Sequence, residues 1–246
     1  MDFNERLEKF KAIVKEANHI AFFGGAGVST ESGIPDFRSK DGLYNQHDVQ
    51  FDMYQPEYLL SHDCLFNEPK VFYEYYRQKL DCRGIEPNIT HLKLAELEGK
   101  GKRISVITQN IDGLHQKAGS KEVYELHGST LRNYCSACGE KYDAEYIFDS
   151  KEAVVTCPKC GRGLVRPEVT LYGELLPDDF EKALNEIRKS DLMIVAGTSL
   201  TVYPAASLVQ YFRGNNLVVI NRDATSADSY ADLVFHESLG EIFTKL

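Results

Sequence analysis

The chain has 246 residues, of which 43% are hydrophobic and 26% charged, so it is long and apolar enough to bury a folded core. Its formal net charge is −9, from 28 basic and 37 acidic residues, which disfavours general binding to nucleic acid but not to a cationic, lysine-bearing substrate. The acidic start has no apolar signal core and no run of 18 apolar residues follows, so we expect a soluble, cytoplasmic protein that does not enter a membrane.

The first elements are predicted from the spacing of apolar residues. These recur at steps of four and three from Phe3 to Ala17, which predicts a helix over residues 2–17. The apolar run 19–23 then ends in Gly24-Gly25-Ala26-Gly27, which indicates a buried strand and a tight turn. We expect a helix after this turn, because strand, glycine turn and helix often form a nucleotide site.

Later segments repeat this alternation of strand and helix. Further buried strands are predicted at 104–107, 192–196 and 217–220, and helices at 88–99, 178–189 and 204–213. The alternation predicts an α/β fold, a Rossmann-like doubly wound parallel sheet.

The alternation stops between residues 130 and 167, where cysteines and glycines cluster. We therefore predict a small inserted lobe at 130–167, with 1–129 and 168–246 forming the main domain. Residues 39–66 show no clear period and are expected to form an irregular, partly helical connection.

Four of the six cysteines form two Cys-x-x-Cys pairs, Cys135 with Cys138 and Cys157 with Cys160, separated by eighteen residues. This is the spacing of a zinc ribbon, and four thiolates would fill the tetrahedral shell of one structural zinc ion. Two disulfides are the alternative, which a reducing compartment disfavours.

The glycine turn continues through Ser29 and Thr30 to Gly33-Ile34-Pro35-Asp36-Phe37-Arg38. Backbone N–H groups of such a turn can bind a pyrophosphate. Thr30 stands where the dinucleotide fingerprint has its third glycine, and no acidic residue ends an obvious second strand. A hydride-transfer dehydrogenase is therefore disfavoured.

Polar side chains follow the predicted strand 104–107, in Thr108-Gln109-Asn110-Ile111-Asp112. Ligands bind at the carboxyl ends of strands in such sheets. His127 ends another apolar segment, at the boundary with the inserted lobe, and could act as a general base near neutral pH. Taken alone, a single histidine is more often structural.

Together with Gly197-Thr198-Ser199-Leu200, these motifs resemble those of the sirtuins, which are NAD-dependent protein lysine deacylases. The resemblance follows the family's motif order over essentially the whole chain. It implies an enzyme of the bacterial, acetyl-lysine-preferring type that transfers the acyl group from lysine to ADP-ribose, releases nicotinamide and so consumes NAD as a co-substrate.

The resemblance also implies roles for individual residues. His127 would be the catalytic base, and Asn110 would position a ribose or a water molecule. The implied NAD-binding residues are Gly25, Ala26, Gly27, Thr30, Asp36, Phe37, Arg38, Gln109, Asn110, Ile111, Asp112, His127, Gly197, Thr198, Ser199, Asn221, Arg222 and Leu239.

In sirtuins the substrate peptide binds as an added strand, which here would lie between 170–174 and 200–203, with contacts from Thr170, Tyr172 and Val202. Many relatives have threonine at Gly24, and valine and phenylalanine are usual at Thr170 and Tyr172. We expect these departures to affect rate and substrate fit.

The acyl preference is predicted from one further difference. Sirtuins that prefer acidic acyl groups carry a tyrosine and an arginine three residues apart, whereas here Arg77 follows Tyr73 by four. Acetyl or another neutral acyl group is therefore predicted.

Other functions remain open from the sequence. Protein mono-ADP-ribosyl transfer, or removal of acyl groups other than acetyl, would use the same pocket. A nucleic-acid-binding zinc ribbon is disfavoured because 130–167 mixes basic and acidic residues. The expected partners are acyl-lysine proteins or peptides, with no membrane and no specific nucleic acid; the oligomeric state is left open, and a monomer is compatible with the sequence.

Overall fold

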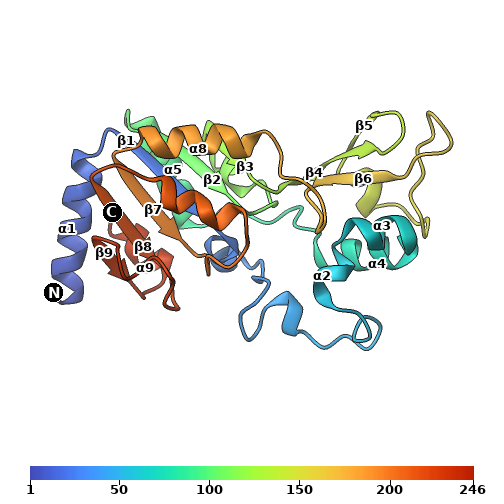
Figure 1. Ribbon diagram of the computed structural model, residues 1–246, viewed down its shortest axis with the longest axis horizontal. Coiled ribbons are helices and arrows are strands. Elements are labelled where there is room, and N and C mark those ends of the chain that lie inside the picture. The colour runs from blue at the N-terminus through green and yellow to red at the C-terminus, as the bar shows by residue number, and fades with distance from the viewer.

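A six-stranded parallel sheet forms the centre of the larger lobe in the computed structural model, which describes all residues 1–246 (Figure 1). Its strand order is β3-β2-β1-β7-β8-β9. The strands are β1 His19–Gly24, β2 Arg103–Thr108, β3 Glu122–Glu125, β7 Leu192–Ala196, β8 Asn216–Ile220 and β9 Leu233–Phe235. The predicted α/β class and the four predicted strands are confirmed.

Helices cover both faces of this sheet because apolar side chains alternate along each buried strand. In β1, Phe22 packs in a cluster with Phe10 of α1, whereas Phe23 packs on the opposite face with Ile187 of α8. The first face is covered by α1 Phe3–Glu16, α5 Ile89–Gly99 and α9 Leu239–Thr244, and the second by α8 Asp179–Lys189 and the 3₁₀ helix η4 Ala205–Tyr211. A short helix, α6 Leu114–Ala118, packs beside α5.

The prediction of a helix after the glycine turn is wrong. The chain forms two single 3₁₀ turns there, η1 Ala26–Val28 and η2 Thr30–Ser32. Gly33 then takes a left-handed conformation with φ of 92°, and Pro35 follows, so helical hydrogen bonding cannot propagate. The turn therefore leads into an irregular loop that reaches the 3₁₀ turn η3 Leu43–Asn45.

A separate antiparallel sheet of three strands forms the smaller lobe, in the order β5-β4-β6 (Figure 1). Its elements are β4 Gly128–Cys135, β5 Lys141–Asp143, β6 Val165–Val169 and the short helix α7 Glu145–Phe148. The predicted limits 130–167 lie within this sheet and stay a prediction for the boundaries of the insertion.

A second stretch of chain packs against this sheet. It contains α2 Pro56–Leu59, α3 His62–Asn67 and α4 Pro69–Lys79. Tyr73 of α4 donates a hydrogen bond to the carbonyl of Val165 at 2.8 Å, and Tyr76 stacks on Phe148 with ring centroids 5.2 Å apart. The smaller lobe is therefore built from two segments that are distant in sequence. None of the helices combines the length and apolarity needed to cross a membrane.

Candidate active site

A cleft of about 470 Å³ is lined by residues of both lobes and lies at the carboxyl ends of β1, β2, β7 and β8. The chain moves outward from β1 to β3 and then returns to β7 on the other side of β1, so the strand order reverses at this point. Doubly wound sheets bind nucleotides at such a switch point.

Nearly all the predicted ligand-binding residues line this cleft; Asp112 does not. The predicted residues in its lining are Gly25, Ala26, Gly27, Thr30, Asp36, Phe37, Arg38, Gln109, Asn110, Ile111, His127, Thr170, Tyr172, Gly197, Thr198, Ser199, Val202, Asn221, Arg222 and Leu239. Their assignment to NAD and substrate stays a prediction, but the fold brings them to one place.

The glycine turn and the end of β7 approach each other closely at the floor of the cleft. The N–H of Gly27 donates to the carbonyl of Gly197 at 2.9 Å. A Cβ on Gly27 would lie 2.8 Å from the Cα of Gly197, and one on Gly197, whose φ is +57°, would lie 2.5 Å from the N of Val28. Glycine is therefore required on both sides of this contact.

Asp112 lies in a smaller adjoining cavity of about 170 Å³, whose lining includes Ala26, Phe37, Asn110 and Ile111 from the main cleft. The Ser29 hydroxyl donates to Asp112 Oδ2 at 2.6 Å and accepts from Asn110 Nδ2 at 3.0 Å. Leu114 N–H donates to Asp112 Oδ1 at 2.9 Å. Burial raises the pKa of Asp112, while the Ser29 and Leu114 hydrogen bonds oppose that rise.

This chain of hydrogen bonds fixes the Asn110 side chain at the edge of the cleft, because its amide nitrogen is held by Ser29. Ser29 itself is only 1% exposed. It was not among the predicted site residues, although it lies inside the glycine-rich motif that pointed to the site.

His127 lies half-buried in the cleft lining, at the start of the smaller lobe. Its Nδ1 donates to the carbonyl of Gln109 at 3.0 Å, so Nε2 carries the lone pair of the neutral imidazole. Burial lowers the pKa of His127, and the hydrogen bond to Gln109 only partly opposes this. The ring is therefore a neutral proton acceptor at pH 7.

Gln109 links the ends of two strands. Its Nε2 donates to Thr198 Oγ1 at 3.1 Å, across the cleft floor from β2 to the segment after β7. The same residue thereby orients His127 through its carbonyl and Thr198 through its side chain.

Sequence reasoning also missed Glu31 and Tyr44, both of which line the cleft. A Glu31 carboxylate oxygen accepts from the N–H of Gly240 in α9 at 3.1 Å. Glu31 lies inside the glycine-rich motif, as Ser29 does, whereas Tyr44 carries no sequence signal because only the tertiary fold brings it to the cleft.

The four predicted metal ligands form one cluster in the smaller lobe. Their sulfur atoms all lie within 4.8 Å of one another, with Cys135 and Cys160 at 3.6 Å and Cys138 and Cys157 at 3.8 Å. Sulfurs around a tetrahedral zinc with bonds of about 2.3 Å are about 3.8 Å apart, whereas a disulfide is about 2.05 Å long. The cluster is therefore compatible with one zinc ion, and none of the six cysteines forms a disulfide.

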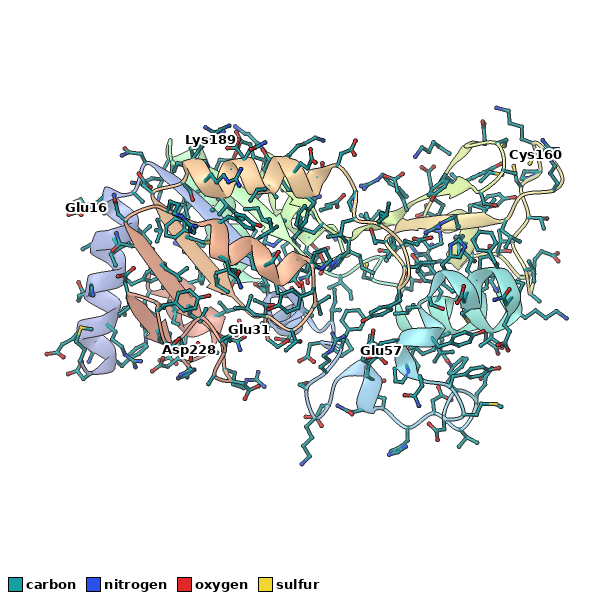
Figure 2. The ribbon with its side chains drawn as sticks, viewed as in Figure 1. Glu16, Glu31, Glu57, Cys160, Lys189 and Asp228 are labelled. Atoms are coloured by element: carbon teal, nitrogen blue, oxygen red, sulfur yellow. The ribbon has the colours of Figure 1, made fainter.

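The metal cluster lies away from the cleft. Figure 2 shows Cys160 at the outer end of the smaller lobe, and none of the four cysteines lines the cleft. With four sulfur ligands no position is left for a substrate, so the ion would stabilise the lobe and take no part in catalysis.

The fold and the cleft define an α/β nucleotide-binding enzyme with an added four-cysteine lobe. Residues 25–204 match the model of the Sir2 family. The chain belongs to the Sir2 family, which confirms the resemblance inferred from its motifs.

Relatives named NAD-dependent protein deacetylase include one from Clostridium perfringens, 51% identical over 99% of both chains. Another from Clostridium acetobutylicum is 50% identical over 97% of this chain and 96% of its own. Among solved structures, a Sir2–p53 peptide–NAD⁺ complex is 37% identical with a TM-score of 0.84, and Sir2 bound to acetylated peptide is 35% identical with a TM-score of 0.85; each covers 97% of this chain and 96% of its own.

Proposed function

We propose that this chain is an NAD-dependent protein lysine deacetylase that transfers the acetyl group from lysine to ADP-ribose and releases nicotinamide. The observation that carries the proposal is His127, whose ring is oriented by the Gln109 carbonyl in a cleft at the sheet's switch point. The names of the relatives that share half of its residues agree with it.

The cleft fits a dinucleotide by its chemistry. Glycines at 25, 27 and 197 let the turn after β1 and the end of β7 pack closely at the cleft floor, and Thr198, Ser199, Asn221 and Arg222 offer donors along the side that extends over β8. When bound, NAD supplies the ribose that accepts the acyl group and the nicotinamide that leaves. We assign the smaller cavity beside Asp112 to nicotinamide, because Phe37 and Asn110 border both spaces.

We infer that His127 accepts a proton at Nε2 from a hydroxyl in the cleft while Gln109 holds its Nδ1–H. Asn110 orients polar groups of the ligand, and the Ser29–Asp112 pair keeps its amide in place. Thr170, Tyr172 and Val202 border the same cleft and are assigned to the acyl-lysine peptide. Acyl-lysine proteins or peptides are the proposed partners.

A neutral acyl group suits this site. Arg77 Nε and Nη2 donate to the carbonyls of Ile147 at 2.9 Å and Glu152 at 2.7 Å, and Tyr73 donates to Val165. Both side chains are thus bound to the backbone of the smaller lobe and line no part of the cleft. We therefore propose that acetyl-lysine is used in preference to succinyl-lysine.

We assign residues 130–167 to a zinc-binding insertion within a main domain of 1–129 and 168–246. We further propose a cytoplasmic location, because a four-thiolate metal site and two unpaired cysteines suit a reducing compartment. Cell fractionation followed by detection of the chain tests the location.

The deciding experiment measures nicotinamide release with NAD and acetyl-, succinyl- or long-acyl-lysine peptides. We expect release that requires both NAD and the acetyl peptide, and its loss in His127→Ala. His47→Ala is the matched control, because the His47 side chain is 96% exposed and does not line the cleft. ADP-ribose that stays on protein without acyl-lysine would instead indicate mono-ADP-ribosyl transfer.

A further inference from the structure

The phenolic hydroxyl of Tyr172 joins two walls of the cleft. Arg38 Nη2 donates to this hydroxyl at 3.0 Å, and the hydroxyls of Tyr44 and Tyr172 lie 3.1 Å apart. The Arg38 guanidinium also lies over the Tyr44 ring, 5.3 Å from its centroid. One oxygen atom therefore connects the loop after the glycine turn with the segment that follows β6.

Tyr172 is anchored by its own backbone. Its N–H donates to the carbonyl of Leu60, and its carbonyl accepts from the N–H of His62, both at 3.0 Å. These bonds hold the 170–174 segment against the start of α3, so the Tyr172 side chain projects from a fixed support.

The loop that carries Arg38 is ordered by its own contacts. Asp36 Oδ1 accepts from the N–H groups of Arg38 at 3.0 Å and Ser39 at 2.7 Å, and Asn45 Nδ2 donates to the carbonyls of both residues. These bonds shape the loop, but they leave the guanidinium free to point elsewhere.

Tyr172 is the residue that directs the guanidinium. The nearest carboxylate, on Glu57, lies 3.9 Å from Arg38 Nη2, beyond hydrogen-bond distance. Glu57 lies on α2 of the smaller lobe, as Figure 2 shows. Without the Tyr172 hydroxyl, Arg38 would keep only this weak ion pair and the face of Tyr44.

We propose that Tyr172 is a positioning residue that acts through Arg38: its hydroxyl holds the guanidinium, and with it loop 36–45, over the cleft before the ligand arrives. The inference rests on the proposed function in assigning Arg38 to NAD. The hydrogen bond between Tyr172 and Arg38 couples the proposed peptide-binding segment directly to the proposed NAD-binding loop.

The link itself is tested without ligand or activity, by hydrogen exchange of the amides of residues 37–45. Tyr172→Phe removes only the hydroxyl and is expected to speed exchange about three- to ten-fold. Tyr172→Phe added to Arg38→Ala with Tyr44→Phe is expected to have no further effect, because the Tyr172 hydroxyl has then lost both of its partners in the loop. Unchanged exchange in Tyr172→Phe alone, or a further effect in the combined variant, would overturn the link.

The positioning role is tested by NAD titration in a calorimeter without peptide. We expect the Kd of NAD to rise about three- to ten-fold in Tyr172→Phe. Tyr211→Phe is the control, since Tyr211 in η4 is 39% exposed against 37% for Tyr172 and lines no part of the cleft. An unchanged Kd of NAD would overturn the role, including the case in which Tyr172→Phe raises only the KM of the peptide in the deacetylation assay. A wild-type chain that binds NAD but does not deacetylate would overturn the proposed function alone.

Discussion

Replacing Ser29 with alanine removes the centre of the hydrogen-bond chain that joins Asn110 to Asp112. The lost bonds measure 2.6 Å to the Asp112 carboxylate and 3.0 Å from the Asn110 amide. A hydrogen bond to a charged group contributes about 1.5–3 kcal/mol and a neutral one about 1 kcal/mol. Ser29 is 1% and Asp112 9% exposed, so water cannot readily replace the hydroxyl.

We therefore expect Ser29→Ala to lower the free energy of unfolding by about 2–4 kcal/mol. Urea denaturation followed by circular dichroism measures this loss. Ser229→Ala is the control, because its exposed hydroxyl makes only a 3.4 Å contact with the Ser226 carbonyl, and it should change stability by less than about 0.5 kcal/mol.

The same substitution should raise the KM for NAD, since the Asn110 amide loses the group that orients it. If Ser29→Ala unfolds at the same urea concentration as the wild type and keeps its KM, the buried chain contributes neither stability nor orientation, and the reasoning is refuted.

Burial lowers the pKa of His127 below its ordinary 6.5. The rate of deacetylation should therefore stay at its plateau at pH 7 and fall only below pH 6.5, where acid protonates Nε2. A profile of kcat/KM against pH with its midpoint above about pH 7 would contradict this. Cys157→Ser, or removal of the metal by a chelator, should unfold the smaller lobe and abolish activity, because the cysteine packs in the same core as Tyr73; full activity in protein shown by elemental analysis to lack zinc would count against it. Gly197→Ala should lower the free energy of unfolding by more than about 3 kcal/mol in the same urea assay, because its Cβ would strike backbone atoms of Gly27 and Val28. Gly84→Ala is the control: Gly84 also has a positive φ but has open space around it, so the loss should be about 1 kcal/mol.

Much of the main domain could be predicted because its signals are local. Apolar spacing located the helix α1 and the buried strands, and the spacing of Cys135, Cys138, Cys157 and Cys160 predicted their meeting, which the sulfur distances bear out. Each of these signals depends on residues that are neighbours in one element or one short motif.

One prediction failed, at the glycine turn. The turn suggested a helix, yet Gly33 with its positive φ and Pro35 without an N–H interrupt helical hydrogen bonding and give 3₁₀ turns and a loop that borders the cleft. The irregular, partly helical connection expected at 39–66 is confirmed, but α2 and α3 are too short to display a period, so their packing against β6 and the metal lobe could not be predicted.

The motifs of this chain determined by themselves its family, its sheet and the chemical groups of the cleft. Only the tertiary structure decided how those groups act: Gln109 selects the proton-accepting nitrogen of His127, and Tyr172 meets Arg38 across 134 positions of sequence. The physical reason is that a hydrogen bond depends on ångström distances and on direction, which the spacing of residues along a chain does not specify.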